Sequence, residues 1–127
     1  MTARRPLHLQ VSVVMPCHQR LRSLERAVRS VLASADSVPG EVEIILVDDC
    51  SPVPIEDALR TVLKDARITV LRHANNRGPA AARNTGIARA KFDLVLFTDD
   101  DVVVDLAWIE RLARYLRDAP PRVGGVG

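Results

Sequence analysis

Short runs of β-branched and leucine residues alternate along this chain with segments of helical periodicity, and that alternation restricts its possible folds most. The apolar runs end at Pro, Asp, Asn or Gly, as strands commonly do. Alternating strands and helices are typical of a parallel sheet covered by helices. We therefore predict an α/β domain with strands over residues 10–15, 42–47, 67–71, 94–98 and 123–126.

Helices are expected between these strands, because apolar residues recur there at three- and four-residue steps. The last helix has Asp105 as its N-cap and Leu106 on its inward face. Right-handed connections collect the loops that follow the strands along one edge of the sheet, where open α/β sheets bind ligands. The expected helices cover residues 21–35, 55–63, 78–90 and 105–117.

Composition excludes several functions. The 18 basic and 16 acidic residues leave a net charge of +2, so no strong electrostatic field attracts nucleic acid. Aromatic residues make up 3%, too few for a platform on which nucleic-acid bases stack. The apolar runs are far below the roughly 20 residues of a membrane helix. Cys17 and Cys50 lack disulfide-framework or zinc spacing, so we expect reduced thiols and a cytoplasmic location.

Four arginines flank the apolar stripe of the first helix. They are either a patch that binds an anionic ligand or a solvated helix face, and mixed charged faces are usually solvated. We therefore assign no chemistry to Arg20, Arg22, Arg26 and Arg29.

The acidic run Asp99-Asp100-Asp101 follows an apolar strand and precedes three valines. Crowded carboxylates become tolerable when a hard divalent cation shares their oxygens, and Mg²⁺ or Mn²⁺ held by one or two carboxylates plus phosphates fits this ligand set. The alternative is an acidic loop whose aspartates cap helix termini and turns.

Two further groups lie at the same predicted edge. Asp48 and Asp49 end the second strand, where a carboxylate can accept hydrogen bonds from a base or a ribose, although a plain turn is the alternative. Arg83 lies in the third helix and either reaches a base or phosphate or forms a salt bridge with a strand-end aspartate.

Four segments together resemble family 2 glycosyltransferases, whose nucleotide-binding half has the GT-A fold. The resemblance implies that Pro16, Cys17 and His18 line a nucleotide pocket and that Asp49 contacts a base, typically uracil. It matches the Asp run to the family's Asp-X-Asp signature, with Asp99 near the ribose and Asp101 and Asp99 assigned to the metal; whether Asp100 or Asp101 binds the cation stays open. The segments are 11–16, 43–51, 76–86 and 97–101.

The resemblance also implies what these residues lack. We expect residues 1–127 to be the donor half of a single GT-A domain, a three-layer fold whose C-terminal part is missing here. The general base and the acceptor pocket are expected beyond Gly127, so no catalytic residue is assigned, and this chain alone should bind a UDP-sugar without transferring it. An unfinished last strand favours self-association. The longer enzyme is expected in the cytoplasm or at the cytoplasmic face of the membrane.

The two cysteines lead to one departure from the family pattern and one hypothesis. Cys50 stands where the family often has glycine, which implies a differently shaped turn. Cys17 and Cys50 reach the same sheet edge, so a reversible disulfide is a hypothesis.

Two other functions compete with sugar transfer. One is a nucleotide-binding or interaction module without transferase activity. The other is a dinucleotide-binding oxidoreductase domain, which the missing G-x-G-x-x-G after the first strand disfavours.

Overall fold

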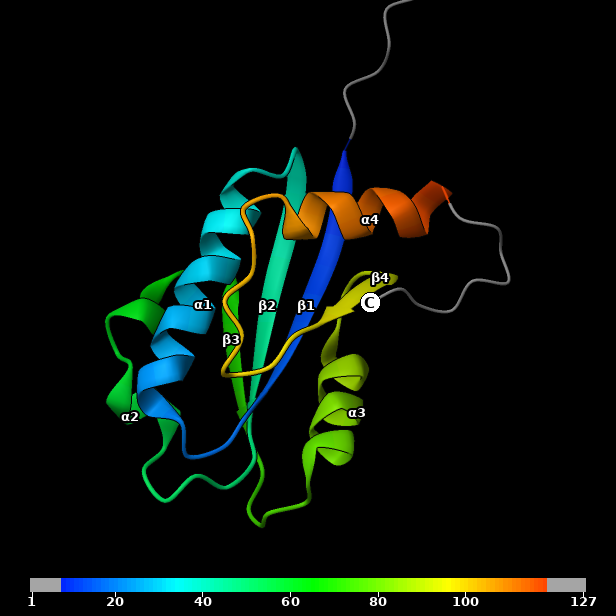
Figure 1. Ribbon diagram of the computed structural model, residues 1–127. Coiled ribbons are helices and arrows are strands. Elements are labelled where there is room, and N and C mark those ends of the chain that lie inside the picture. Colours follow the sequence, from blue (N-terminus) through cyan, green and yellow to red (C-terminus); the bar gives the residue numbers. More distant parts are fainter. Residues whose placement is uncertain (1–7, 119–127) are drawn as a thin grey trace, which may run out of the picture.

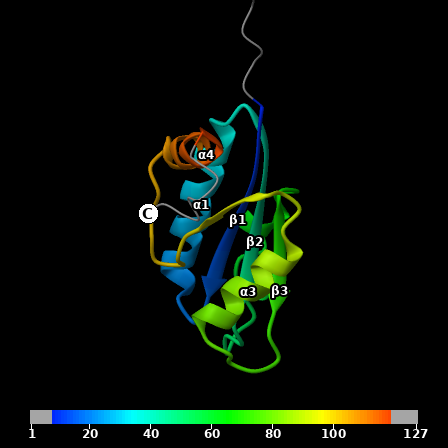
Figure 2. The ribbon, with the colours of Figure 1, turned by 90° about the vertical axis from the view of Figure 1, so that its right-hand side faces the viewer.

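The structure, a computed structural model, describes residues 8–118 and contains a parallel sheet between two layers of helices (Figures 1 and 2). Its strand order is β3-β2-β1-β4, which confirms the predicted α/β parallel sheet. The predicted strand over 123–126 lies outside the described residues. The elements are β1 (Leu9–Cys17), α1 (Leu21–Asp36), β2 (Gly40–Asp48), α2 (Ile55–Ala58), the 3₁₀ turn η1 (Val62–Lys64), β3 (Ile68–Arg72), α3 (Pro79–Arg89), β4 (Leu94–Phe97) and α4 (Trp108–Asp118).

The two central strands, β1 and β2, are continuously apolar over residues 13–15 and 44–47, where both faces of the sheet are covered. They pair in parallel from Leu9 opposite Gly40 to Cys17 opposite Asp48, and helices cover both faces of the pair. Alternate residues serve opposite faces: Val13 belongs to the core under α1, and its neighbour Val14 to the core under α3. A strand buried on both faces has no place for polar alternation.

Helices α1 and α4 pack on one face of the sheet, and α3 packs on the other (Figure 2). Helix α1 buries an apolar stripe that includes Leu24, Val28 and Val31, as its periodicity predicted. Helix α3 uses small residues instead, with Ala82 and Gly86 buried against the strands. Among residues 8–118, no helix is both long and apolar enough to span a membrane.

The expected helix over 55–63 is wrong as a continuous helix. Helix α2 ends after a single turn because Leu59 leaves the helical region, with φ −119° and ψ 33°, and the chain resumes as η1. Leu59 and Val62, on either side of the break, are both buried in the core, whereas Ala58 is exposed.

The last helix begins three residues later than predicted, at Trp108 instead of Asp105. Asp105 caps the preceding turn: its Oδ2 accepts the Ala107 N–H at 3.3 Å, and its carbonyl accepts the Trp108 N–H at 3.0 Å. Leu106, predicted to face inward, is 61% exposed. The segment before α4 follows α1 instead, because Ser30 Oγ accepts the Val104 N–H and Ser34 Oγ accepts the Ile109 N–H.

Gly86 gives a direct test of the packing between α3 and the sheet. A Cβ at this position would lie 2.3 Å from Val14 Cγ1, closer than any van der Waals contact. We expect Gly86→Ala to lower the free energy of unfolding by about 1–3 kcal/mol, as overpacking of a core does, despite the better helix propensity of alanine. Urea denaturation measures the change. If the clash is the cause, adding Val14→Ala should give a double variant that loses less stability than the two single losses combined.

Candidate functional site

The loops that follow the four strands meet at one cavity of about 410 Å³ at the carboxyl edge of the sheet. Among the residues assigned from the sequence, Asp48 and Arg83 do not line it, whereas the others do. The lining consists of Pro16, Cys17, His18, Arg20, Asp49, Asn76, Gly78, Pro79, Asp99, Asp100 and Asp101.

Asp48, expected to bind a nucleotide, fastens the loop that follows β2 instead. Its carboxylate is buried and accepts the Ser51 N–H at 3.0 Å, the Ile55 N–H at 3.2 Å and a hydrogen bond from Arg72 Nη1. Burial alone would raise the pKa of Asp48, but these hydrogen bonds outweigh it and the pKa is lowered. Asp48 therefore stays ionised and shapes the loop from behind the cavity.

Asp49 has a structural role and also reaches the cavity. Its Oδ1 accepts hydrogen bonds from His73 Nδ1 at 2.8 Å and the Arg77 N–H at 2.9 Å, and its Oδ2 accepts the Gly78 N–H at 2.9 Å. Burial opposes ionisation, yet these donors lower the pKa of Asp49. A carboxylate has about four acceptor positions, so roughly one remains for a ligand.

His73 was not identified from the sequence, although it follows the third strand directly. It is buried, and its Nε2 lies 2.8 Å from Thr85 Oγ1 while its Nδ1 bonds Asp49. Thr85 in turn lies 3.0 Å from the Ala81 carbonyl, within α3. The chain Asp49–His73–Thr85 thus fixes α3 against the end of β2.

His18 connects two of the loops and has a defined tautomer. Its backbone N–H donates to Asp100 Oδ2 at 3.0 Å, and its Nδ1 lies 2.8 Å from the Asp49 carbonyl oxygen. Because a carbonyl oxygen only accepts, Nδ1 carries the hydrogen. In the neutral ring, Nε2 therefore keeps its lone pair and is an acceptor at the cavity wall.

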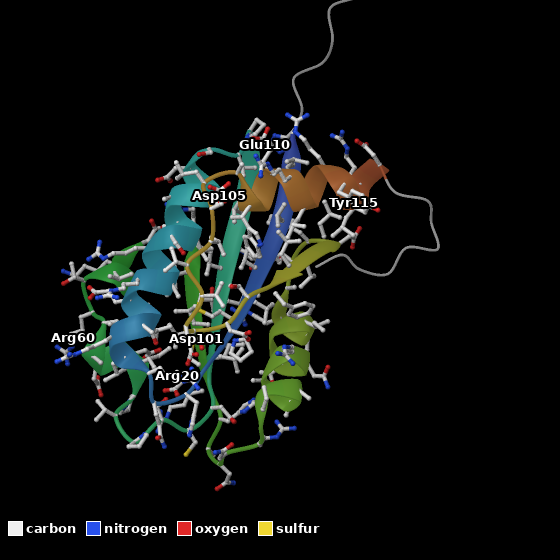
Figure 3. The ribbon with its side chains drawn as sticks, in the orientation of Figure 1. Arg20, Arg60, Asp101, Asp105, Glu110 and Tyr115 are labelled. Atoms are coloured by element: carbon white, nitrogen blue, oxygen red, sulfur yellow. The ribbon has the colours of Figure 1, made fainter. Side chains whose placement is uncertain are left out.

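The three aspartates of the acidic run occupy different environments. Asp99 and Asp101 are exposed, with Arg83 Nη2 3.6 Å from Asp99 Oδ1 and Arg20 Nη1 2.7 Å from Asp101 Oδ2 (Figure 3 labels the second pair). Asp100 is buried between them and accepts the His18 N–H. Arg83 therefore forms the salt bridge that was one of its two predicted roles.

Burial raises the pKa of Asp100, and the neighbouring carboxylates Asp101 and Asp99 raise it further. The His18 N–H and Arg20 act in the opposite direction but do not cancel the effect. The ligand-free fold therefore disfavours the charged form of Asp100.

The described part of the chain, residues 8–118, contains no group of three His, Cys, Asp or Glu side chains that could hold a metal ion. The exposed carboxylates of Asp99 and Asp101 still fit a cation of the Mg²⁺ type, which takes one or two protein carboxylates and completes its shell with phosphate oxygens and water. The inward orientation of Asp100 leaves Asp101 better placed for this role.

The two cysteines are free and do not form the hypothesised disulfide in this structure. Cys17 donates to the Met15 carbonyl, and Cys50 to the Ala74 carbonyl. Burial, together with Asp100 and Asp48, raises the pKa of the Cys17 thiol well above its usual range, which disfavours the thiolate that disulfide exchange requires. Cys50 has φ 60°, so its turn keeps the left-handed conformation that favours glycine.

Arg20 was interpreted as part of a solvated helix face, and its side chain is exposed as that interpretation expects, but the structure also places it at the cavity. It precedes α1 and lines the cavity, although its side chain is also partly exposed to solvent. The signal in the sequence was its position: Arg20 stands directly between a strand-end loop and a helix, so it belongs to the binding edge and not to the helix flank.

Replacing Asp100 with asparagine tests whether the buried charge destabilises the ligand-free fold. A raised pKa in the folded state means that Asp100 contributes stability below its ordinary pKa and loses it as the pH rises through the folded value. With chelator present, we expect Asp100→Asn to raise the midpoint of thermal unfolding by a few degrees at pH 7. The gain should shrink as the pH is lowered towards the ordinary pKa of an aspartate, because the raised pKa lets the wild-type carboxyl take up its proton earlier in that titration. An equal gain at both ends of this pH range would contradict this explanation.

Solved structures with the same fold include two glycosyltransferases. Staphylococcus aureus TarS 1–349 aligns with a TM-score of 0.74 at 24% identity, over 87% of this chain and 33% of that chain. The mannosyltransferase PcManGT from Pyrobaculum calidifontis aligns with a TM-score of 0.74 at 23% identity, over 93% of this chain and 34% of that chain. The described part of this chain therefore has the core of the GT-A fold.

Two curated relatives are more similar in sequence. The pre-mycofactocin glycosyltransferase of Mycobacterium tuberculosis is 37% identical over 113 residues, which is 89% of this chain and 22% of the relative. The succinoglycan biosynthesis protein ExoO of Rhizobium meliloti is 36% identical over 111 residues, which is 86% of this chain and 29% of the relative. The chain thus spans about a quarter of the length of these relatives.

The family model described as glycosyl transferase family 2 matches residues 12–126, which contain all four strand-end loops of the site. This match extends over nearly the whole sequence, and the resemblance seen in the four sequence segments is confirmed. The chain belongs to glycosyl transferase family 2.

Proposed function

We propose that this chain is the donor-binding half of an inverting, metal-dependent glycosyltransferase and that its cavity binds a nucleoside-diphosphate sugar. The observation that carries the proposal is the convergence of the acidic run, Asp49 and His18 on one cavity at the carboxyl edge of a parallel sheet. Solved structures of the same fold support it: TarS has been solved with UDP and with UDP-GlcNAc, and PcManGT with GDP-Man and Mn²⁺.

We assign different side chains of the site to different parts of the donor. Asp49 Oδ2 has acceptor capacity for a ring N–H of the base, and the His18 Nε2 lone pair can accept a hydrogen bond from the base or the ribose. We assign Asp99 to a ribose hydroxyl, and Asp99 and Asp101 together to the oxygens that hold Mn²⁺ or Mg²⁺. UDP-sugars are the donor we favour.

Transfer of the sugar breaks the bond between its anomeric carbon and a phosphate oxygen, and a new bond to an acceptor oxygen forms. A bound divalent cation would supply charge neutralisation for the departing diphosphate. The role of this chain is to bind and orient that leaving group. Removal of the acceptor proton needs a base on the other side of the sugar, and we assign that base and the acceptor pocket to residues outside 1–127.

Titration calorimetry of the purified 127-residue chain tests this function. We expect UDP, GDP or dTDP to bind with Mn²⁺ present and to bind much more weakly in chelator. Asp101→Asn should weaken the Mn²⁺-dependent binding by about tenfold or more, because even groups that only support metal ligands change metal affinity by that much. The purified chain should transfer no sugar.

The matched control is Asp57→Asn, an exposed aspartate of α2 outside the cavity lining, which should leave binding unchanged. Binding that ignores both Mn²⁺ and Asp101 would favour a plain nucleotide-binding module. If the folded chain binds none of the three nucleotides with Mn²⁺, the proposed function is wrong.

A further inference from the structure

The cavity has an unequal charge distribution. Four carboxyl groups line it, from Asp49, Asp99, Asp100 and Asp101, and among residues 8–118 Arg20 is the one permanently charged cation in the lining. A diphosphate carries several negative charges and would enter a wall of the same sign. Arg20 is therefore the group in the lining that can offer the phosphates a permanent positive charge.

The backbone of Arg20 is firmly held. Its carbonyl accepts the Leu24 N–H at 2.8 Å in the first turn of α1, and the preceding residue, Gln19, donates its N–H to Ser51 Oγ at 3.1 Å. The guanidinium, in contrast, is anchored only at its tip, where Nη1 lies 2.7 Å from Asp101 Oδ2 (Figure 3). A long side chain on a fixed backbone can change partner without a change in the loop.

The ion pair between Arg20 and Asp101 is easy to exchange. Both side chains are about half exposed, at 60% and 46%, and ion pairs of this kind contribute little because water and salt screen them. Asp101 is also an oxygen donor that we assign to the cation. The guanidinium and the cation therefore compete for the same carboxylate, and they repel each other when both are close to it.

Phosphate is a suitable second partner for this side chain. Guanidinium groups present a planar set of N–H donors that match phosphate oxygens in a bidentate way, which an ammonium group does not. The N-terminus of α1 follows Arg20 directly, so the side chain starts where the helix dipole also favours anions.

We propose that Arg20 exchanges partners when donor and cation bind: it neutralises Asp101 in the ligand-free chain, then leaves that carboxylate to the cation and binds the diphosphate. This inference rests on the proposed function. It predicts that Arg20 opposes binding of the cation alone and favours binding of the nucleotide once the cation is present. Cation and nucleotide are thereby coupled through one side chain.

A simpler role would be that of a structural tie between the loop after β1 and the loop after β4. The two roles predict opposite changes in cation binding when the Arg20 side chain is removed. Loss of a structural tie would loosen the site and weaken cation and nucleotide binding together. Loss of an exchanging arginine would strengthen the first and weaken the second.

The experiment uses the 127-residue chain in four forms: wild type, Arg20→Ala, Arg20→Lys and Arg22→Ala. Arg22 is an exposed arginine of α1 outside the cavity lining, and it is the matched control. Thermal unfolding first establishes that each form is folded. Mn²⁺ alone is then titrated by electron paramagnetic resonance, and UDP and GDP are titrated by calorimetry at saturating Mn²⁺.

We expect Arg20→Ala to bind Mn²⁺ alone about two- to fivefold more tightly, the range that an exposed ion pair allows. The same variant should bind the nucleotide at saturating Mn²⁺ about tenfold or more weakly, as loss of hydrogen bonds to a charged group does. Arg20→Lys should fall between wild type and Arg20→Ala for the nucleotide, because it keeps the charge without the planar donor set. Arg22→Ala should match the wild type in both titrations.

Two other outcomes are informative: one contradicts the partner exchange alone, and one contradicts the proposed function. If the wild type binds Mn²⁺ and nucleotide but Arg20→Ala weakens both or changes neither, the partner exchange is wrong and the proposed function stands. If the folded wild type binds neither UDP nor GDP with Mn²⁺, the donor-binding function fails, and the role of Arg20 in it fails as well.

Discussion

Asp49, through its buried carboxylate and its backbone carbonyl, joins three of the four loops that build the site. Its oxygens hold His73 and the backbone N–H groups of Arg77 and Gly78, and its own carbonyl accepts the hydrogen bond from His18 Nδ1. A buried carboxylate is tolerated only when donors surround it, and here the donors come from one segment, residues 73–78, that is distant from Asp49 in the sequence. The same residue thus fixes the loop between β3 and α3, sets the tautomer of His18, and still reaches the cavity. The register of β1 and β2 makes this possible, since Cys17 and Asp48 lie opposite each other where both strands end.

Much of the architecture could be predicted from the sequence because burial on both faces of a parallel sheet leaves a strong signal. Parts of β1, β2 and β4, over residues 13–15, 44–47 and 94–97, are continuous apolar segments that are followed by polar or turn-forming residues. The predictions failed where helical periodicity or a capping residue was the only evidence for the bounds of a helix. Leu59 and Val62 have helical spacing and are both buried in the core, yet the backbone breaks at Leu59. Asp105 is a good capping residue, but the turn that it caps precedes the helix, because Ser30 and Ser34 of α1 hold the connecting segment.

For the site, too, the sequence predicted one property and not another: where residues lie along the sheet edge, but not how their side chains are oriented. A strand end predicts where a residue lies along the sheet edge, and so the acidic run and the loop containing His18 were located correctly. It does not predict which way a side chain turns, because that depends on hydrogen-bond donors in other loops. Asp48 and Asp49 are neighbours with the same side chain, yet the donors Ser51, Ile55 and Arg72 hold the first behind the cavity. His73 was missed for the same reason, since its importance lies in a contact with Asp49 that only the fold creates.

The acidic run Asp99-Asp100-Asp101 places three adjacent carboxyl groups at one edge of the sheet. Three adjacent carboxylates repel one another, and the fold meets this with Arg83 at Asp99, Arg20 at Asp101 and a backbone N–H at Asp100. Burial is the main reason that the pKa of Asp100 is raised, and the carboxylates of Asp101 and Asp99 add to it, while the His18 N–H and Arg20 offset the effect in part. A ligand that brings a divalent cation adds the missing positive charge, and any ligand that binds only the folded state stabilises that state. The crowding of negative charge in this run is therefore the feature on which the proposed binding of a cation with a diphosphate rests, and the two arginines offset part of that charge within the fold itself.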